Sequence, residues 1–242
     1  MAEPATVRPE DFLKRSPLHG TLAAAGARFV ERGGAAVAHD FRDPAAEAAA
    51  RGRMGLADLS PCARTGFKGA GTAEWLSGQG LVLPEASNQA TRQGGGLLAA
   101  RLAPTELLLL DAALGDGAAV RGLEAAWQAE PLPPATPRGF PVPRADSHAW
   151  LRVTGSQAPA MFAKLCGVDL RAHKFADLAI AQTQIARISA IVIRDDLAGG
   201  PAYHLLCDSA SAAYLWACLI DAMAEFDGRP VGLAALEGAG ER

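Results

Sequence analysis

Apolar and polar residues alternate in two stretches of the chain that are built alike. One stretch begins near Ser60 and the other near Asp146, and in both a glycine turn and an alanine-rich helical pattern come next. Each stretch leads to a further apolar run that enters a helix, over residues 106–127 in the first copy and 203–226 in the second. Two copies of a strand, helix, strand, helix unit predict two similar lobes that face each other, with any ligand between them.

Helix starts and a hairpin are signalled outside these copies. Ser16 and Asp43 each stand as a capping residue before a proline, which predicts one helix running toward Ala27 and another over residues 45–53. Residues 28–38, with two glycines at the centre, predict a short hairpin.

The second half of the chain adds a strand pair and an apolar helix. The β-branched run over residues 182–194 predicts a strand pair or one long bent strand, and residues 210–226 predict a helix. The apolar stripe of that helix is expected to face the core rather than a cofactor. The stripe consists of Tyr214, Leu215, Cys218, Leu219 and Met223.

The elements indicate an α+β protein, because strands and helices do not alternate strictly along the chain. Residues 1–15 are polar and offer little apolar surface, so they are predicted to be a flexible N-terminal tail. Residues 131–143 contain six prolines, which disfavour regular backbone hydrogen bonding. The predicted division is therefore a tail over 1–15, a first lobe over 16–130, a proline-rich linker over 131–145 and a second lobe over 146–242.

Composition narrows the class of protein. The 242 residues are 50% hydrophobic, enough to bury a core without disulfides or a structural metal. Charged residues make up 20% of the chain and the net charge is −3, which gives no reason to expect nucleic acid as a partner. No secretion signal and no run of eighteen apolar residues is present, so a membrane span is not expected and the cytoplasm is the predicted location.

The cysteines, histidines, glycines and serines of the chain do not show the spacing of known disulfide, metal, nucleotide or catalytic motifs. The four cysteines form no C-x-x-C motif and are predicted to be buried thiols, although a Cys207–Cys218 bridge stays open. The five histidines show no metal-ligand spacing, so no metal site is predicted. Gly69–Glu74 lacks the third glycine of a dinucleotide-binding turn, and Ser60 and Ser147 lack the context of a catalytic serine.

Two further patterns have ordinary explanations. Asp195 and Asp196 are interpreted as a solvated hairpin turn, because L-A-G-G-P follows them. Gly94–Gly96 is interpreted as a flexible turn, which would line the rim of the space between the lobes together with Leu97 and Leu98.

Segments in a fixed order resemble one family. Residues 16–30 resemble the opening of the T-protein of the glycine cleavage system, and Gly55–Ser60 resembles its G-L-F-D-[VL]-S segment. Residues 232–237 resemble the point at which T-proteins continue into a further domain. The chain thus resembles the folate-binding aminomethyltransferase superfamily. The resemblance implies two similar mixed lobes of the T-protein folate-binding type, without the C-terminal barrel domain.

Within this superfamily, the sequence most resembles the gamma subunit of heterotetrameric sarcosine oxidase. Residues 101–109 are similar to the L-G-P-D-E-W-L-L strand of that subunit. Residues 169–183 and 209–226 are similar to parts of its second lobe.

Two carboxylates of the aminomethyltransferase pattern are absent. The Asp-Asp pair of the family aligns with Gly95 and Gly96, and the Glu of its R-T-G-Y-T-G-E turn aligns with Gly200. The arginine of that turn is retained as Arg194. A hydrogen bond to a charged acceptor contributes about 1.5–3 kcal/mol, so the loss of both contacts argues against autonomous folate chemistry.

The resemblance implies a non-catalytic subunit of a multi-subunit flavoenzyme that oxidatively demethylates sarcosine or a related N-methyl amine. Its partners would be the other subunits of that amine oxidase, which would carry flavin, dinucleotide and folate. No residue of this chain is expected to be catalytic and none to bind metal.

Two alternatives stay open. A stand-alone aminomethyltransferase-like protein of one-carbon metabolism would bind tetrahydrofolate through Asp195 or Asp196 beside Arg194, which makes these three the candidates for cofactor binding. A homo-oligomer would instead bind another small acid at Arg194.

Overall fold

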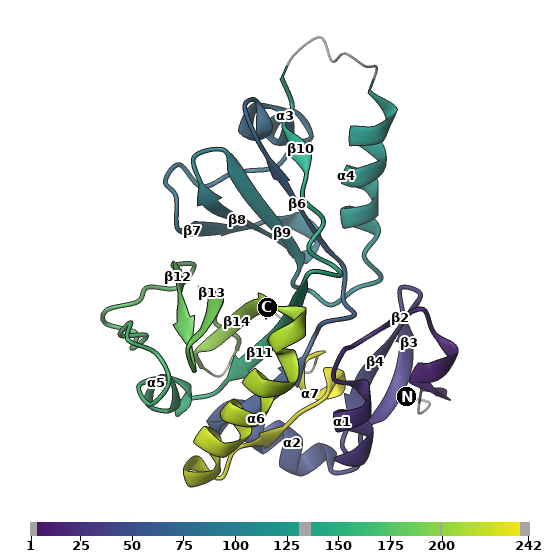
Figure 1. Cartoon of the computed structure of the whole chain (residues 1–242), viewed down its shortest axis with the longest axis vertical. Coiled ribbons are helices and arrows are strands. Elements are labelled where there is room, and N and C mark those ends of the chain that lie inside the picture. Colours follow the sequence, from purple (N-terminus) through teal and green to yellow (C-terminus); the bar gives the residue numbers. More distant parts are fainter. Residues whose placement is uncertain (1–3, 131–136, 199, 238–242) are drawn as a thin grey trace.

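The computed structural model describes residues 4–130, 137–198 and 200–237, and these form a mixed α and β protein with three sheets (Figure 1). The sheets have the strand orders β1-β3-β4-β2, β10-β6-β9-β8-β7 and β12-β13-β14-β11-β5-β15. The prediction of a mixed α and β protein is therefore confirmed.

The first sheet is built by the N-terminal forty residues. The predicted hairpin is present as β3 (Arg28–Arg32) and β4 (Ala35–Asp40), joined by two glycines with positive φ. The remaining elements here are β1 (Thr6–Val7), the 3₁₀ turn Pro9–Asp11, β2 (Lys14–Arg15) and α1 (His19–Ala24).

The predicted flexible tail is wrong for residues 4–15. β1 pairs with β3 and β2 pairs with β4, so both edges of the hairpin are covered by this segment. Backbone hydrogen bonds supply the anchoring here, and these do not require the apolar side chains on which the sequence prediction depended.

The second sheet and its helices form the upper lobe in Figure 1. The chain enters at β6, and α3 and α4 lie beside the sheet in the upper part of that view. The elements are β6 (Arg64–Lys68), α3 (Thr72–Gly78), β7 (Gln89–Arg92), the 3₁₀ turn Gly94–Gly96, β8 (Leu97–Ala103), β9 (Glu106–Asp111), α4 (Ala118–Ala129) and β10 (Phe140–Pro141).

The third sheet and its helices form the lower lobe. The strand pair predicted over residues 182–194 and the helix predicted over residues 210–226 are both present there. Its elements are α2 (Pro44–Arg53), β5 (Gly55–Asp58), β11 (His148–Thr154), α5 (Ala158–Phe162), β12 (Ile180–Ile185), β13 (Ile188–Arg194), β14 (Ala202–Asp208), the 3₁₀ turn Ser209–Ser211, α6 (Ala212–Met223), the 3₁₀ turn Ala224–Phe226, β15 (Arg229–Pro230) and α7 (Leu233–Glu237). The strands β6-β9-β8-β7 and β11-β14-β13-β12 follow one order of connection in their two sheets.

The boundary between lobes differs from the predicted one. β5 falls within the predicted first lobe, yet it pairs with β11 of the lower sheet. Phe140 and Pro141, placed in the linker, pair with β6 of the upper sheet, where an edge strand tolerates proline. Residues 131–136 of the predicted linker lie outside the described residues. Local sequence signals do not show which sheet a short strand joins, and this explains the difference.

The two lobes pack through the facing sides of their sheets. Along β11, Leu151 and Val153 belong to the core under α6, whereas Trp150 points to the other face. There it shares a core with Leu98 and Leu108 of the upper sheet. Side chains therefore fill much of the space in which the repeat pattern places a ligand.

The apolar stripe of α6 is only partly buried. Leu215, Leu219 and Met223 are buried as predicted, but Tyr214 is 54% exposed. All four cysteines are free thiols, so the Cys207–Cys218 bridge is not formed.

Candidate functional site

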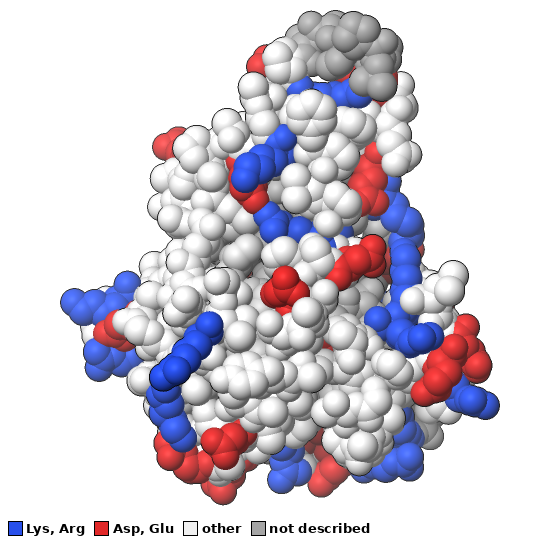
Figure 2. All heavy atoms as spheres, viewed as in Figure 1, with Lys and Arg blue, Asp and Glu red and all other residues white. Residues whose placement is uncertain are grey.

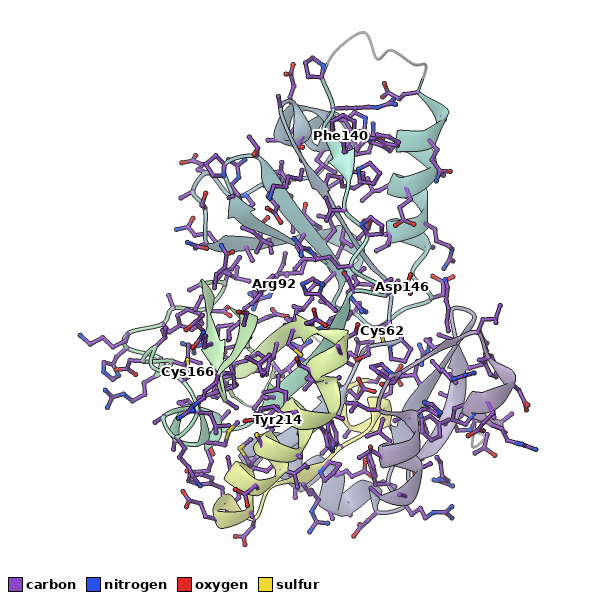
Figure 3. All side chains as sticks on the ribbon, in the orientation of Figure 1. Cys62, Arg92, Phe140, Asp146, Cys166 and Tyr214 are labelled. Atoms are coloured by element: carbon purple, nitrogen blue, oxygen red, sulfur yellow. The ribbon has the colours of Figure 1, made fainter. Side chains whose placement is uncertain are left out.

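A pocket of about 630 Å³ lies where β7 of the upper lobe meets the end of β13. It brings together two of the three predicted candidates, Arg194 and Asp196, with Arg92 from the upper lobe, which is labelled at the junction of the lobes in Figure 3. The pocket is lined by Arg92, Asp177, Arg194, Asp196, Leu197, Gly200 and Pro201.

Arg194 forms a two-point ion pair with Asp196. Its Nε donates to Oδ1 at 2.8 Å and its Nη2 donates to Oδ2 at 2.6 Å. The third nitrogen, Nη1, donates to the carbonyl oxygen of Phe175 at 2.6 Å. The hydrogen bond with Asp196 raises the pKa of Arg194 above its usual value. The guanidinium is thus engaged on every nitrogen, and it is not a free anion-binding group.

Asp195 is buried rather than exposed in a hairpin turn, so the interpretation as a solvated turn is wrong for this residue. Its amide donates to the carbonyl oxygen of Ala202 at 2.8 Å, which turns the carboxylate inward. Oδ1 accepts from Nε of Arg92 at 2.8 Å, and Oδ2 accepts from Nη2 of Arg152 at 3.1 Å. The carboxylate therefore joins one arginine from each lobe.

His204 completes this buried network. Trp150 Nε1 is a donor only, and it lies 3.0 Å from His204 Nδ1, so Nδ1 accepts and Nε2–H donates to Asp195 Oδ2 at 3.0 Å. Burial lowers the pKa of His204 to about 4, and the imidazole is neutral at pH 7. Burial alone would raise the pKa of Asp195, but the hydrogen bond from His204 and the charges of Arg152 and Arg92 hold it well below its usual range.

Asp177 is the third carboxylate of this site. Arg92 Nη2 lies 3.1 and 2.9 Å from its two oxygens, and the amide of Asp196 donates to Oδ1 at 3.0 Å. Each of the six carboxylate oxygens of Asp177, Asp195 and Asp196 thus has a partner within the chain. Three aspartates face three arginines, so neither charge is left in excess.

Gly95, Gly96 and Gly200, which the sequence comparison aligns with carboxylates of the family, are in positions that tolerate a side chain poorly. A side chain at Gly96 would place Cβ 2.1 Å from Cβ of Ala113. Gly95 and Gly200 have free space around them, but their φ angles of +74° and +147° strain any other residue. Leu97 and Leu98 point to opposite faces of β8. Leu98 packs into the core between the lobes, whereas Leu97 lies in the core of the upper lobe, so the expectation that both line the inter-lobe space is wrong for Leu97.

Sequence reasoning missed Arg92, Asp177, Arg152 and His204. One signal was available: Arg152 stands inside the apolar strand A-W-L-R-V-T, two residues after Trp150, and alternation puts both on one buried face. A buried arginine requires an acceptor, which predicts a carboxylate opposite it. Nothing in the sequence shows which of the 26 acidic residues supplies it.

Ser60, which was considered as a catalytic serine, has a structural role. The Ser60 hydroxyl donates to Asp58 Oδ1 at 2.6 Å and accepts from the amide of Trp150 at 3.1 Å, so it serves as a buried link between β5 and β11.

Among the described residues no group of three or more His, Cys, Asp or Glu side chains is arranged to hold a metal ion. No helix in the described ranges is both long and apolar enough to cross a membrane.

The sequence matches the model of the GCVT N-terminal domain family over residues 18–239. The chain belongs to this family. The predicted relationship to T-proteins and their aminomethyltransferase superfamily is therefore confirmed. A search of curated proteins found no significant match.

Two solved structures share the fold of this GCVT-family chain. A chain of heterotetrameric sarcosine oxidase from Corynebacterium sp. U-96, in complex with pyrrole 2-carboxylate, aligns with 23% identity and a TM-score of 0.59 over 79% of this chain and 96% of that one. The glycine cleavage system aminomethyltransferase T from Bartonella henselae aligns with 20% identity and a TM-score of 0.70 over 94% of this chain and 62% of that one. At these identities the likeness concerns the fold.

Proposed function

We propose that this chain is a non-catalytic, gamma-type subunit of a sarcosine oxidase-like flavoenzyme that oxidatively demethylates an N-methyl amine. The observation that carries the proposal is the internal pairing of three carboxylates with the chain's own arginines: Asp177 and Asp196, which line the pocket, and the buried Asp195 beside them. A folate-binding member of the superfamily needs a carboxylate free to accept from the pterin, and each oxygen here already has a donor. Flavin, dinucleotide and folate would then be held by the partner subunits.

The similarity in fold to a chain of a heterotetrameric sarcosine oxidase, with a TM-score of 0.59, supports the same choice. The proposal includes an internal repeat of the two lobes, for which the shared strand order is the support, and a location in the cytoplasm.

The surface suits a protein partner better than a polyanion. In the view of Figure 2, basic and acidic side chains lie close together, and broad areas between them carry neither charge. A nucleic acid partner would need a continuous basic patch, and this face does not present one.

A stand-alone tetrahydrofolate-binding protein is the second candidate, favoured by the higher TM-score of 0.70 with an aminomethyltransferase. Asp195 or Asp196 would then have to give up its hydrogen bonds from an arginine of the chain and accept hydrogen bonds from the pterin instead. The third candidate is a small acid bound at Arg194. That acid would have to displace Asp196, which already forms an ion pair with the guanidinium.

Co-purification tests the proposed assembly. A tagged form of the chain, expressed at its native level in its own host, is expected to be recovered with stoichiometric partner subunits and with the absorbance bands of bound flavin. The chain recovered alone, without any flavoprotein, would contradict the proposed role.

A further inference from the structure

The hydrogen bonds around His204 fit the neutral imidazole alone. The side chain is buried in β14, and its ring centroid lies 5.4 Å from that of Trp150 in β11. The indole Nε1–H of Trp150 can only donate, so His204 Nδ1 offers its lone pair to it at 3.0 Å. A proton on Nδ1 would set two N–H donors against each other, and the buried indole N–H would lose its acceptor.

The charges around the ring also oppose its protonation. Nε2 donates to Asp195 Oδ2 at 3.0 Å, and this carboxylate already pairs with Arg152 of β11 and Arg92 of β7. Arg152 lies directly opposite His204 in the ladder, and the uncharged Ile193 of β13 lies on the other side of β14. An imidazolium would therefore be a third cation beside one buried carboxylate.

Both hydrogen-bond partners of the ring connect the two lobes. Trp150, which donates to Nδ1, shares a core with Leu98 of the upper sheet. Asp195, which accepts from Nε2, also binds Arg92 of the upper lobe at 2.8 Å. A change in the charge of the imidazole thus acts on the apolar contact and on the ionic contact between the lobes together.

We propose that His204 is a pH-sensitive switch at the lobe junction: the neutral ring holds the lobes together, and uptake of a proton from solvent on Nδ1 separates them. Separation exposes the ring to water, where the imidazolium is stable, so the open form binds the proton that the closed form excludes.

The direction of the pH effect follows from the two states of the ring. The pKa of His204 is about 4 in the closed form, because burial disfavours the cation, and 6.5 where the ring is free in water. The stability that the neutral ring gives to the junction is complete above about pH 6.5 and is lost as the pH falls from 6.5 toward 4.

The test is hydrogen exchange of the Trp150 indole N–H in the isolated full chain, followed by NMR at pH 7 and pH 5. Once the intrinsic exchange rate is removed, its protection factor is expected to fall about twentyfold between these pH values, or about 1.8 kcal/mol. The amide of Leu219 in α6 lies in the core of the lower lobe. It is expected to stay at least about tenfold better protected than the indole at pH 5, because the lobe itself remains folded.

A matched pair of variants isolates the histidine. His204→Asn cannot titrate but keeps an oxygen that can accept from Trp150, so the indole protection factor is expected to change less than about threefold from pH 7 to pH 5. His173→Asn, at an exposed histidine, should show the twentyfold change of the wild type. His148, whose pKa burial also lowers, is present in both variants and does not affect the comparison.

Three results would overturn the proposal. They are a wild-type indole protection factor that is the same at pH 7 and pH 5, equal protection of the indole and of Leu219 at pH 5, and a twentyfold change that persists in His204→Asn. The first two need the wild-type chain alone, so they decide the matter even if His204→Asn does not fold. The measurement requires no partner subunit, and its outcome is independent of the proposed function.

Discussion

Replacing Asp195 with alanine is expected to destabilise the protein by about 3–5 kcal/mol, since it leaves buried charge without its counterion. Arg152 is 2% exposed, and Asp195 is the carboxylate with which it forms an ion pair. The substitution also removes the acceptor of His204 and one of the two aspartates that bind Arg92 from the other lobe. Urea unfolding followed by the fluorescence of the four tryptophans measures the effect.

Two controls separate loss of the network from loss of any acidic residue. Glu225→Ala removes a surface pair with Lys164, at 3.2 Å, and is expected to change stability by less than about 1 kcal/mol. Adding Arg152→Met to Asp195→Ala removes the stranded charge and should recover part of the loss, because an uncompensated buried ion is the main cost. An Asp195→Ala protein within about 1 kcal/mol of wild type would show that the network does not hold the lobes together.

Replacing Arg64 with alanine is the second large expected effect, about 3–5 kcal/mol of destabilisation. Arg64 lies in β6 and is 2% exposed, and its five N–H groups donate to carbonyl oxygens alone. Burial lowers its pKa to about 10, which still leaves it charged at pH 7. The acceptors are the carbonyls of Ser60, Cys62, Arg144, Ala145 and His148.

Truncation at Arg64 would leave several of these carbonyls buried without a donor where the chain passes from one lobe to the other. Arg64→Lys is expected to recover little of the loss, because an ammonium has three donors and cannot match the planar five-donor fork. Arg121→Ala, at an exposed pair with Asp116, is the matched control and should have a small effect. The same urea measurement applies, and an Arg64→Ala protein as stable as the control would contradict this account of the lobe junction.

Local periodicity predicted much of the fold. The alternation in A-W-L-R-V-T gives β11 and its two faces, the paired glycines at residues 33 and 34 give the first hairpin, and the β-branched run gives β12 and β13. These elements are encoded by neighbours in sequence, so pattern alone is sufficient to find them.

Long-range pairing could not be predicted in the same way. β1, β2 and β5 are two to four residues long, and their place depends on partners elsewhere in the chain. The site shows the same limit: Asp195 looks like a turn residue locally, and its burial follows from arginines that lie 43 and 103 positions away. A carboxylate's environment is set by tertiary contacts, and one sequence does not specify them.

Calorimetric titration of the isolated full chain with tetrahydrofolate tests the central claim most directly. That claim is that the chain's own arginines already occupy every carboxylate of the pocket between β7 and β13. The account predicts no saturable heat up to about 1 mM ligand, because a pterin would have to displace a buried or half-buried ion pair to gain an acceptor. Saturable one-to-one binding that Asp196→Asn abolishes would contradict it, and would show that this pocket still binds folate.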